Sequence, residues 1–279
     1  MQEVLPIKLM PEKKLVLYEG QSETIIVSDG TNVLSLALKR SSSSEPADNP
    51  DSIIEPIPDP DGAVYIYVSA IGSNNNDGSS EGQPVESIAT AVEKINSLED
   101  IDKDYVIVVD GTLQGSQKIA AADTDSETGA ALNVFAKSIT IKGINSGTLD
   151  GNGTTPLTLN VSEDVPVTIK DLIITNSDAD ANGVGLEIKG GNIFIENGTQ
   201  ITDNNVCGIY VSNNAKVTMN GGNTAGVYNN DSTFKISGSA SIGNIYLGQN
   251  TKIIVTGSLS GSGTVATIVL AVTTRIPGT

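Results

Sequence analysis

The chain of 279 residues contains no histidine, no tryptophan and a single cysteine. Without histidine there is no imidazole to bind a metal, and neither a Ser-His-Asp triad nor a Cys-His pair can form. Because Cys207 has no partner within the chain, an intrachain disulfide is excluded. Cys207 stands next to Gly208 in an apolar run, which predicts a small buried hydrophobic side chain rather than a nucleophile.

Positive charge is also scarce. The chain has 16 basic residues and 33 acidic ones, which gives a formal net charge of -17. Only two of the basic residues are arginines, Arg40 and Arg275. Nucleic acids and anionic membranes are bound through clustered Lys and Arg, so we expect neither as a partner. An acidic surface attracts Ca²⁺, but solubility is the simpler interpretation of this charge.

Long apolar runs are missing as well. A helix that crosses a bilayer needs about 18 or more consecutive apolar residues, and no such run occurs. The N-terminal MQEVLPIKLMPEKK also lacks the continuous apolar core of a signal peptide. We therefore expect no direct membrane insertion, and no signal peptide is visible in the chain as given.

What the sequence has instead is a short repeat between Gly183 and Gly261. The first apolar residues of its four units are Leu186, Ile209, Val227 and Ile245, with steps of 23, 18 and 18 residues. Within the units apolar and polar residues alternate, which is the period of a strand with one buried face. Gly, Asn, Asp and Ser stand between the strands, where tight turns need them. Units this short bury a core only by stacking, so the pattern predicts a parallel β-solenoid.

These units, with TLDGNG at 148–153, resemble the right-handed parallel β-helix of the pectin-lyase-like superfamily. They are most similar to the non-enzymatic repeat regions of bacterial surface proteins, and the resemblance extends from about Tyr65 to Ala271. It implies an all-β fold, a right-handed parallel β-helix, and a location at the cell surface or outside the cell. On this basis we expect an incomplete start or a trimmed export signal.

Three segments are predicted along the chain. Residues 1–40 contain three alternating apolar runs separated by turns, which indicates a small antiparallel β module, complete or partial. Residues 41–63 are rich in Ser, Pro and acids, a composition typical of a linker. Residues 64–279 form the parallel β-helix, with a capping helix at about 85–98. The apolar residues of that helix share one face: Ile88, Ala89, Val92, Ile95 and Leu98.

The acids closest to a catalytic cluster are Asp178, Asp180 and Asp203. A glycoside hydrolase needs two carboxylates that flank the scissile bond. The segment 176–180, NSDAD, is similar to the Asn-Thr-Asp motif of polygalacturonases, with Ser in place of Thr. However, the paired Asp-Asp, Gly-His-Gly and Arg-Ile-Lys motifs of that family are missing. Resemblance to the uronate lyases would imply Ca²⁺ held by carboxylates and a Lys or Arg base.

A structural interpretation of the same region is favoured. Asn176, Asn204 and Asn244 each follow a short strand that ends in Ile, which predicts a turn ladder of asparagines bonded to neighbouring backbone. Lysines occur about once per coil, mostly on the outward phase. We expect them to be solvated strand positions rather than a lyase base: Lys170, Lys189, Lys216, Lys235 and Lys252.

A Ca²⁺ site is considered for one loop. Asn74, Asn76 and Asp77 carry the oxygen ligands that Ca²⁺ prefers. The loop lacks the alternating acids and distal Glu of an EF-hand, so we expect an Asn/Gly-rich turn and keep Ca²⁺ as the alternative. No other cofactor is predicted.

Two classes of function follow. The first is a non-catalytic module, displayed on a bacterial surface or secreted, that acts as an adhesin, a ligand-binding module or a structural stalk. Its partner would be a host or cell-surface protein or a glycan, and its oligomeric state stays open. The second is a carbohydrate-active enzyme of the same superfamily, either a polysaccharide lyase or a glycoside hydrolase. The first is favoured because histidine, tryptophan and functional arginines are lacking, and one fold serves many functions.

Overall fold

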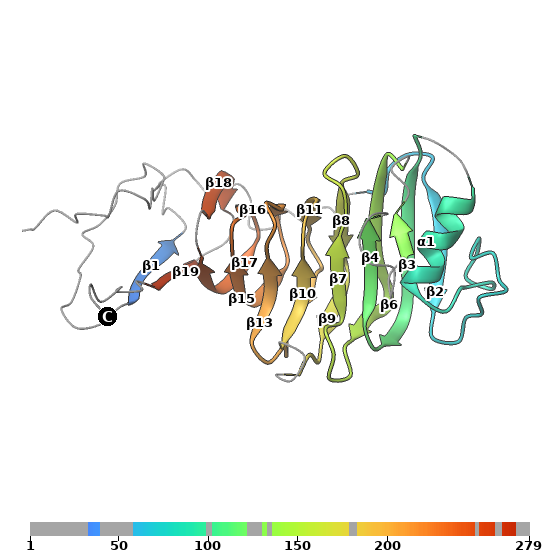
Figure 1. Ribbon diagram of the computed structural model, residues 1–279, viewed down its shortest axis with the longest axis horizontal. Coiled ribbons are helices and arrows are strands. Elements are labelled where there is room, and N and C mark those ends of the chain that lie inside the picture. Colours follow the sequence, from blue (N-terminus) through green and yellow to red (C-terminus); the bar gives the residue numbers. More distant parts are fainter. Residues whose placement is uncertain are drawn as a thin grey trace, which may run out of the picture.

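The computed structural model describes these residues: 33–39, 58–98, 102–121, 130–132, 136–178, 183–248, 251–259 and 264–271. Strands dominate them, and most of the strands join one large, mainly parallel sheet. Figure 1 shows the strands side by side along the longest axis, each turn of the chain against the previous one. This is the arrangement of a parallel β-solenoid, as the repeats predict.

Each turn of the solenoid contributes strands to three ladders. The first ladder pairs strands in parallel from one end of the solenoid to the other. Its strands are β2 (Val64–Ser69), β3 (Asp104–Gln114), β6 (Ser138–Asp150), β8 (Val167–Lys170), β11 (Asn192–Ile195), β14 (Lys216–Met219), β16 (Thr233–Gly238) and β18 (Lys252–Leu259).

The other two ladders complete the wall. The second consists of the ends of β3 and β6, then β9 (Ile173–Thr175), β12 (Gln200–Ile201) and the beginnings of β15 (Asn223–Asn229) and β17 (Ser241–Leu247). The third consists of β4 (Gln117–Ala121), β7 (Leu157–Asn160), β10 (Val184–Ile188), β13 (Cys207–Val211), the later parts of β15 and β17, and β19 (Thr264–Ala271); β5 (Ala130–Leu132) pairs with β4.

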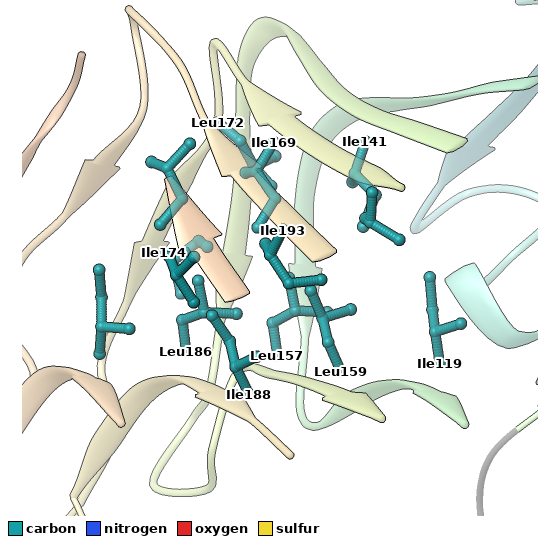
Figure 2. Packing of buried hydrophobic residues seen from close by; sticks show 14 of the residues in the cluster. Ile119, Ile141, Leu157, Leu159, Ile169, Leu172, Ile174, Leu186, Ile188 and Ile193 are labelled. Atoms are coloured by element: carbon teal, nitrogen blue, oxygen red, sulfur yellow. The ribbon is translucent and has the colours of Figure 1, made fainter. Parts of the chain in front are cut away.

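The core lies between the ladders and follows from the alternation in the sequence. Because successive side chains of a strand point to opposite faces, the same register position of every turn meets the interior. One inward column of the first ladder is buried from β2 to β16: Ile66, Ile107, Ile141, Ile169, Ile195, Met219 and Ile236. Figure 2 shows side chains from different ladders, such as Ile174 of the second ladder and Leu186 of the third, gathered inside the coil.

One end of the solenoid is covered by helix α1 (Ile88–Ser97), beside β2 (Figure 1). Its start is fixed by Ser87, whose hydroxyl oxygen accepts a hydrogen bond from the main-chain N–H of Thr90 at 3.1 Å, as an N-cap residue does. Ile88 and Val92 are fully buried, as predicted. The prediction that Leu98 shares this face is wrong: it is the C-cap and is 46% exposed, because the helix ends before it.

The last turn meets strand β1 (Val33–Lys39), which pairs with β19 in antiparallel orientation. Figure 1 shows this pair at the end of the molecule opposite α1. β1 coincides with the third apolar run of residues 1–40. The other two runs, and most of the predicted linker, lie outside the described residues.

Candidate functional site

The outward positions of the third ladder carry a row of tyrosines. Tyr210 on β13 lies beside Tyr228 on β15, which in turn lies beside Tyr246 on β17. Each of them follows a fully buried residue of its strand by one position, and side chains alternate along a strand. The three rings therefore stand on the outer surface of three successive turns. We call Tyr210, Tyr228 and Tyr246 the tyrosine stripe.

The stripe is ordered and open to solvent. The rings of Tyr210 and Tyr228 stack with their centroids 5.5 Å apart and 12° between their planes, within the range that aromatic pairs prefer. Tyr228 remains 41% exposed and Tyr246 38% exposed. Contiguous exposed aromatic surface on a protein commonly marks a site of interaction. The stripe is therefore the strongest candidate for a binding surface on the described part of the chain.

Charge at the edge of the stripe is neutralised locally. Glu187 on β10 is the register neighbour of Tyr210. Its Oε1 lies 3.1 Å from Lys189 Nζ, and its Oε2 accepts a hydrogen bond from the Thr158 hydroxyl at 3.4 Å. Because the acid already has two polar partners, the surface next to Tyr210 carries little net charge.

A cluster of charged residues around Asp59 lies on the outer face of the first ladder. Asp59 Oδ2 is 2.7 Å from Lys142 Nζ, and Asp59 Oδ1 is 2.7 Å from Lys170 Nζ. The Tyr65 hydroxyl also donates to Asp59 Oδ2, at 3.2 Å. The Lys170 side chain is only 6% exposed, against 27% for Lys142. These contacts tie the segment that contains Asp59 to two adjacent turns of the solenoid.

The electrostatics of this group favour a structural role. Burial by itself would raise the pKa of Asp59, but hydrogen bonds from Lys142 and Lys170, together with their charges, lower it below its ordinary value. Both carboxylate oxygens are engaged, so neither is free to bind a metal or accept a proton from a substrate. The prediction that Lys170 is a solvated strand position is wrong, because a residue distant in sequence covers it.

Glu196 continues this column of polar residues beyond Lys170. It is 5% exposed, and burial raises the pKa of its carboxyl. A hydrogen bond from Asn220 and the charge of Lys170 lower this pKa, but burial has the larger effect. Asn220 Nδ2 donates to Glu196 Oε1 at 2.8 Å, and the Ser237 hydroxyl donates to Asn220 Oδ1. The column thus links successive turns by side-chain hydrogen bonds.

Two of the three acids considered as catalytic candidates are described. Asp178 and Asp203 are both exposed, and Asp180 lies outside the described residues. The main-chain N–H of Asn176 donates to the carbonyl oxygen of Asp203 at 3.2 Å, so Asp178 and Asp203 lie two positions apart in register on adjacent turns. The side chain of Asn176 binds neither of these carboxylates, because Asn176 Nδ2 donates to Asp150 Oδ1 at 2.7 Å.

The predicted asparagine ladder is found only in part. Asn204 binds backbone as predicted, since its Nδ2 donates to the carbonyl oxygens of Ile174 and Thr202 at 3.1 and 2.9 Å. The side chain of Asn176 binds a carboxylate instead, and Asn244 lies inside β17 rather than in a turn. The reason is the change of step from 23 to 18 residues: the shorter turns lose the corner loop between the second and third ladders.

The side chains of the loop considered for Ca²⁺ make hydrogen bonds within the protein. Asn74 Oδ1 accepts from the Thr90 hydroxyl at 2.7 Å, and Asn76 Nδ2 donates to a main-chain carbonyl at 2.8 Å. The N–H of Ser79 donates to Asp77 Oδ1 at 2.9 Å, and this bond lowers the pKa of Asp77. Across the described ranges, no three acids or cysteines lie together in a way that could hold a metal ion.

Cys207 is 7% exposed, as predicted for a small buried side chain, and burial raises the pKa of its thiol to about 11.

No helix among the described residues has the length and apolar composition needed to cross a bilayer.

Comparison of the chain with protein-family models, with curated proteins and with solved structures found no match. The class of the protein is thus defined by its fold: a predominantly β chain wound into one large parallel sheet.

The tyrosine stripe is the feature that the sequence prediction missed. A signal for it was present, because the three tyrosines are 18 residues apart and each directly follows the first apolar residue of a repeat unit. The alternation within each unit identifies the inward positions, and the period of the repeat identifies the outward ones as well. Register places position i+1 of every unit on one outer column, so an aromatic residue repeated at that position predicts an aromatic row.

Proposed function

We propose that this chain is a right-handed parallel β-helix, similar to those of the pectin-lyase-like superfamily, which works as a non-catalytic ligand-binding module. Its place would be the surface of a bacterium or a secreted protein. The right hand is supported by the strong preference of parallel strand connections for right-handed crossovers. The location rests on the resemblance of the repeat units to bacterial surface proteins.

The observation that carries the binding function is the tyrosine stripe, in which Tyr210 and Tyr228 stack and Tyr228 and Tyr246 are exposed. Tyrosine supplies a large rigid contact area and a polar hydroxyl at a low cost in conformational entropy, and it is enriched at binding surfaces. A solenoid also keeps such a row rigid, because each turn is fixed by the turns on either side. The ligand is a glycan or a protein of the host or of a cell surface.

The test is an array of neutral glycans, polyuronates and extracellular proteins, probed with and without Ca²⁺. The same samples are assayed for new reducing ends and unsaturated sugar products. We expect binding without cleavage, and loss of binding in a variant with all three stripe tyrosines replaced by alanine.

Two results would contradict the proposal. Cleavage that is lost in Asp178→Ala would make the chain a carbohydrate-active enzyme and assign the acids to its active site. Binding that the triple tyrosine variant retains would move the binding surface elsewhere. A melting curve of each variant separates loss of binding from loss of folding.

A further inference from the structure

The tyrosine stripe runs along the axis of the solenoid. Its rings occupy the same register position of three successive turns, and neighbouring strands lie about 4.8 Å apart, so Tyr210 and Tyr246 are separated by about 10 Å. This distance is two strand spacings. A chain of pyranose sugars laid along the axis, with about one sugar for each strand spacing, would therefore place about one sugar beside each tyrosine.

Small or polar residues stand two positions before the tyrosines of the stripe. Gly208 and Gly226 precede Tyr210 and Tyr228 and are buried; the Thr224 side chain covers Gly208, where a Cβ would clash with Thr224 Oγ1. A Cβ at Gly226 would meet nothing nearer than a carbonyl oxygen at 3.5 Å and would lie 4.0 Å from Tyr246 Cε2. The third ring is flanked by Asn244 at the equivalent position. An exposed tyrosine ring offers apolar contact to the C–H groups of a sugar, while the tyrosine hydroxyl and the Asn244 amide offer hydrogen bonds to the sugar hydroxyls.

Charge is absent from the strands that carry the stripe. β13, β15 and β17 contain no Asp, Glu, Lys or Arg, although the whole chain has 33 acids and 16 basic residues. The nearest charged register neighbour, Glu187, is paired with Lys189 at 3.1 Å. A patch without positive charge on a protein of net charge -17 offers nothing to a polyuronate or another polyanion.

We infer that the tyrosine stripe binds an uncharged oligosaccharide whose chain runs parallel to the solenoid axis. This inference rests on the proposed binding function and names its ligand. A protein partner fits the stripe less well, because a stable protein interface buries about 800 Å² on each side, and a row of three rings about 10 Å long covers only a small part of that area.

The experiment is isothermal titration of the full chain with oligosaccharides of increasing length. The neutral probes are cello-, manno- and chito-oligosaccharides from the disaccharide to the hexasaccharide, and the charged probe is hexagalacturonate. We expect at least one neutral series to bind, with affinity rising until the sugar spans the stripe and then levelling off. Hexagalacturonate is expected to show no binding.

Variants locate the site. Tyr228→Ala and Tyr246→Ala should each weaken binding about tenfold, the scale of one aromatic contact. Tyr228→Phe keeps the ring and should change affinity less than about threefold. The matched control is Tyr67→Ala, since Tyr67 is an outward, partly exposed tyrosine on β2, far along the solenoid from the stripe. We expect it to leave affinity unchanged.

The outcomes separate this inference from the proposed function. Stripe-dependent binding of hexagalacturonate or a protein, with no neutral sugar bound, would overturn the ligand while leaving the binding function intact. A neutral sugar bound equally by wild type and Tyr228→Ala would overturn the site. If no ligand on the array or in the titrations depends on the stripe, both the inference and the proposed function are wrong.

Discussion

Replacing Asp59 by asparagine should destabilise the solenoid far more than a surface mutation does. The carboxylate is the partner of Lys142 and Lys170, and the Lys170 side chain is only 6% exposed. Removing one member of a buried ion pair typically costs about 3–5 kcal/mol, because the remaining charge stays buried. The segment around Asp59 lies on the outside of the coil and can lift to admit water to Lys170. We therefore expect a loss of about 2–3 kcal/mol.

The assay is urea unfolding followed by circular dichroism, with Glu163→Gln as the matched control. Glu163 pairs with Lys216 at 2.5 Å, but both side chains are about half exposed, at 51% and 53%. A pair of that kind contributes less than about 1 kcal/mol. The two variants remove the same charge, so the difference between them measures what the contacts of Asp59 with Lys142, Lys170 and Tyr65 add beyond one exposed ion pair.

The pH dependence gives a second check. The pKa of Asp59 is lowered from its ordinary value of 3.8, so the stability it adds is complete above that pH and is lost as pH falls through the lower pKa of the folded state. The gap between wild type and Asp59→Asn should be constant at neutral pH and close under acid conditions. Equal urea midpoints for Asp59→Asn and Glu163→Gln at pH 7 would refute this reasoning.

Three further predictions concern the core and the turns. Ile236→Asp should abolish the folded circular dichroism signal by burying an unpaired charge at a fully buried position, whereas Lys235→Asp, one residue earlier on the outer face, should melt close to wild type. Gly243→Ala should lower the melting temperature, because its Cβ would lie 2.2 Å from a carbonyl oxygen of the preceding turn, while Gly226→Ala, with 3.5 Å available, should be tolerated. Cys207, with a thiol pKa of about 11, should resist thiol reagents at pH 8 in the native protein and react on unfolding; fast native labelling would contradict its burial.

The ladder was predictable because it rests on local alternation and on the repeat. Val217 and Ile236 stand on the apolar phase of the alternation, and both are fully buried. The steps of 23 and 18 residues also match the register pairs Leu186 with Ile209 and Ile209 with Val227. A strand that exposes one face leaves a pattern in its own residues, whatever lies elsewhere in the chain.

Contacts between distant segments left no such pattern. Lys170 has the sequence environment of an exposed lysine, and only the fold brings Asp59 across it. Asn204 stands shortly after Ile201, and Asn244 stands shortly after Ile242 in the same way. Because the later turn has only 18 residues, Asn244 lies inside strand β17. The number of residues in each turn decided these positions, and that number has meaning only once the register between turns is known.

The most direct test of the binding function is nitration of the tyrosines, measured by mass spectrometry with and without the neutral hexasaccharide that binds most tightly. Tyr228 and Tyr246 are 41% and 38% exposed in the free protein, so both should be nitrated there. We predict that the sugar protects both of them and leaves the nitration of Tyr67 unchanged. A bound sugar that leaves Tyr228 and Tyr246 as reactive as before would contradict it.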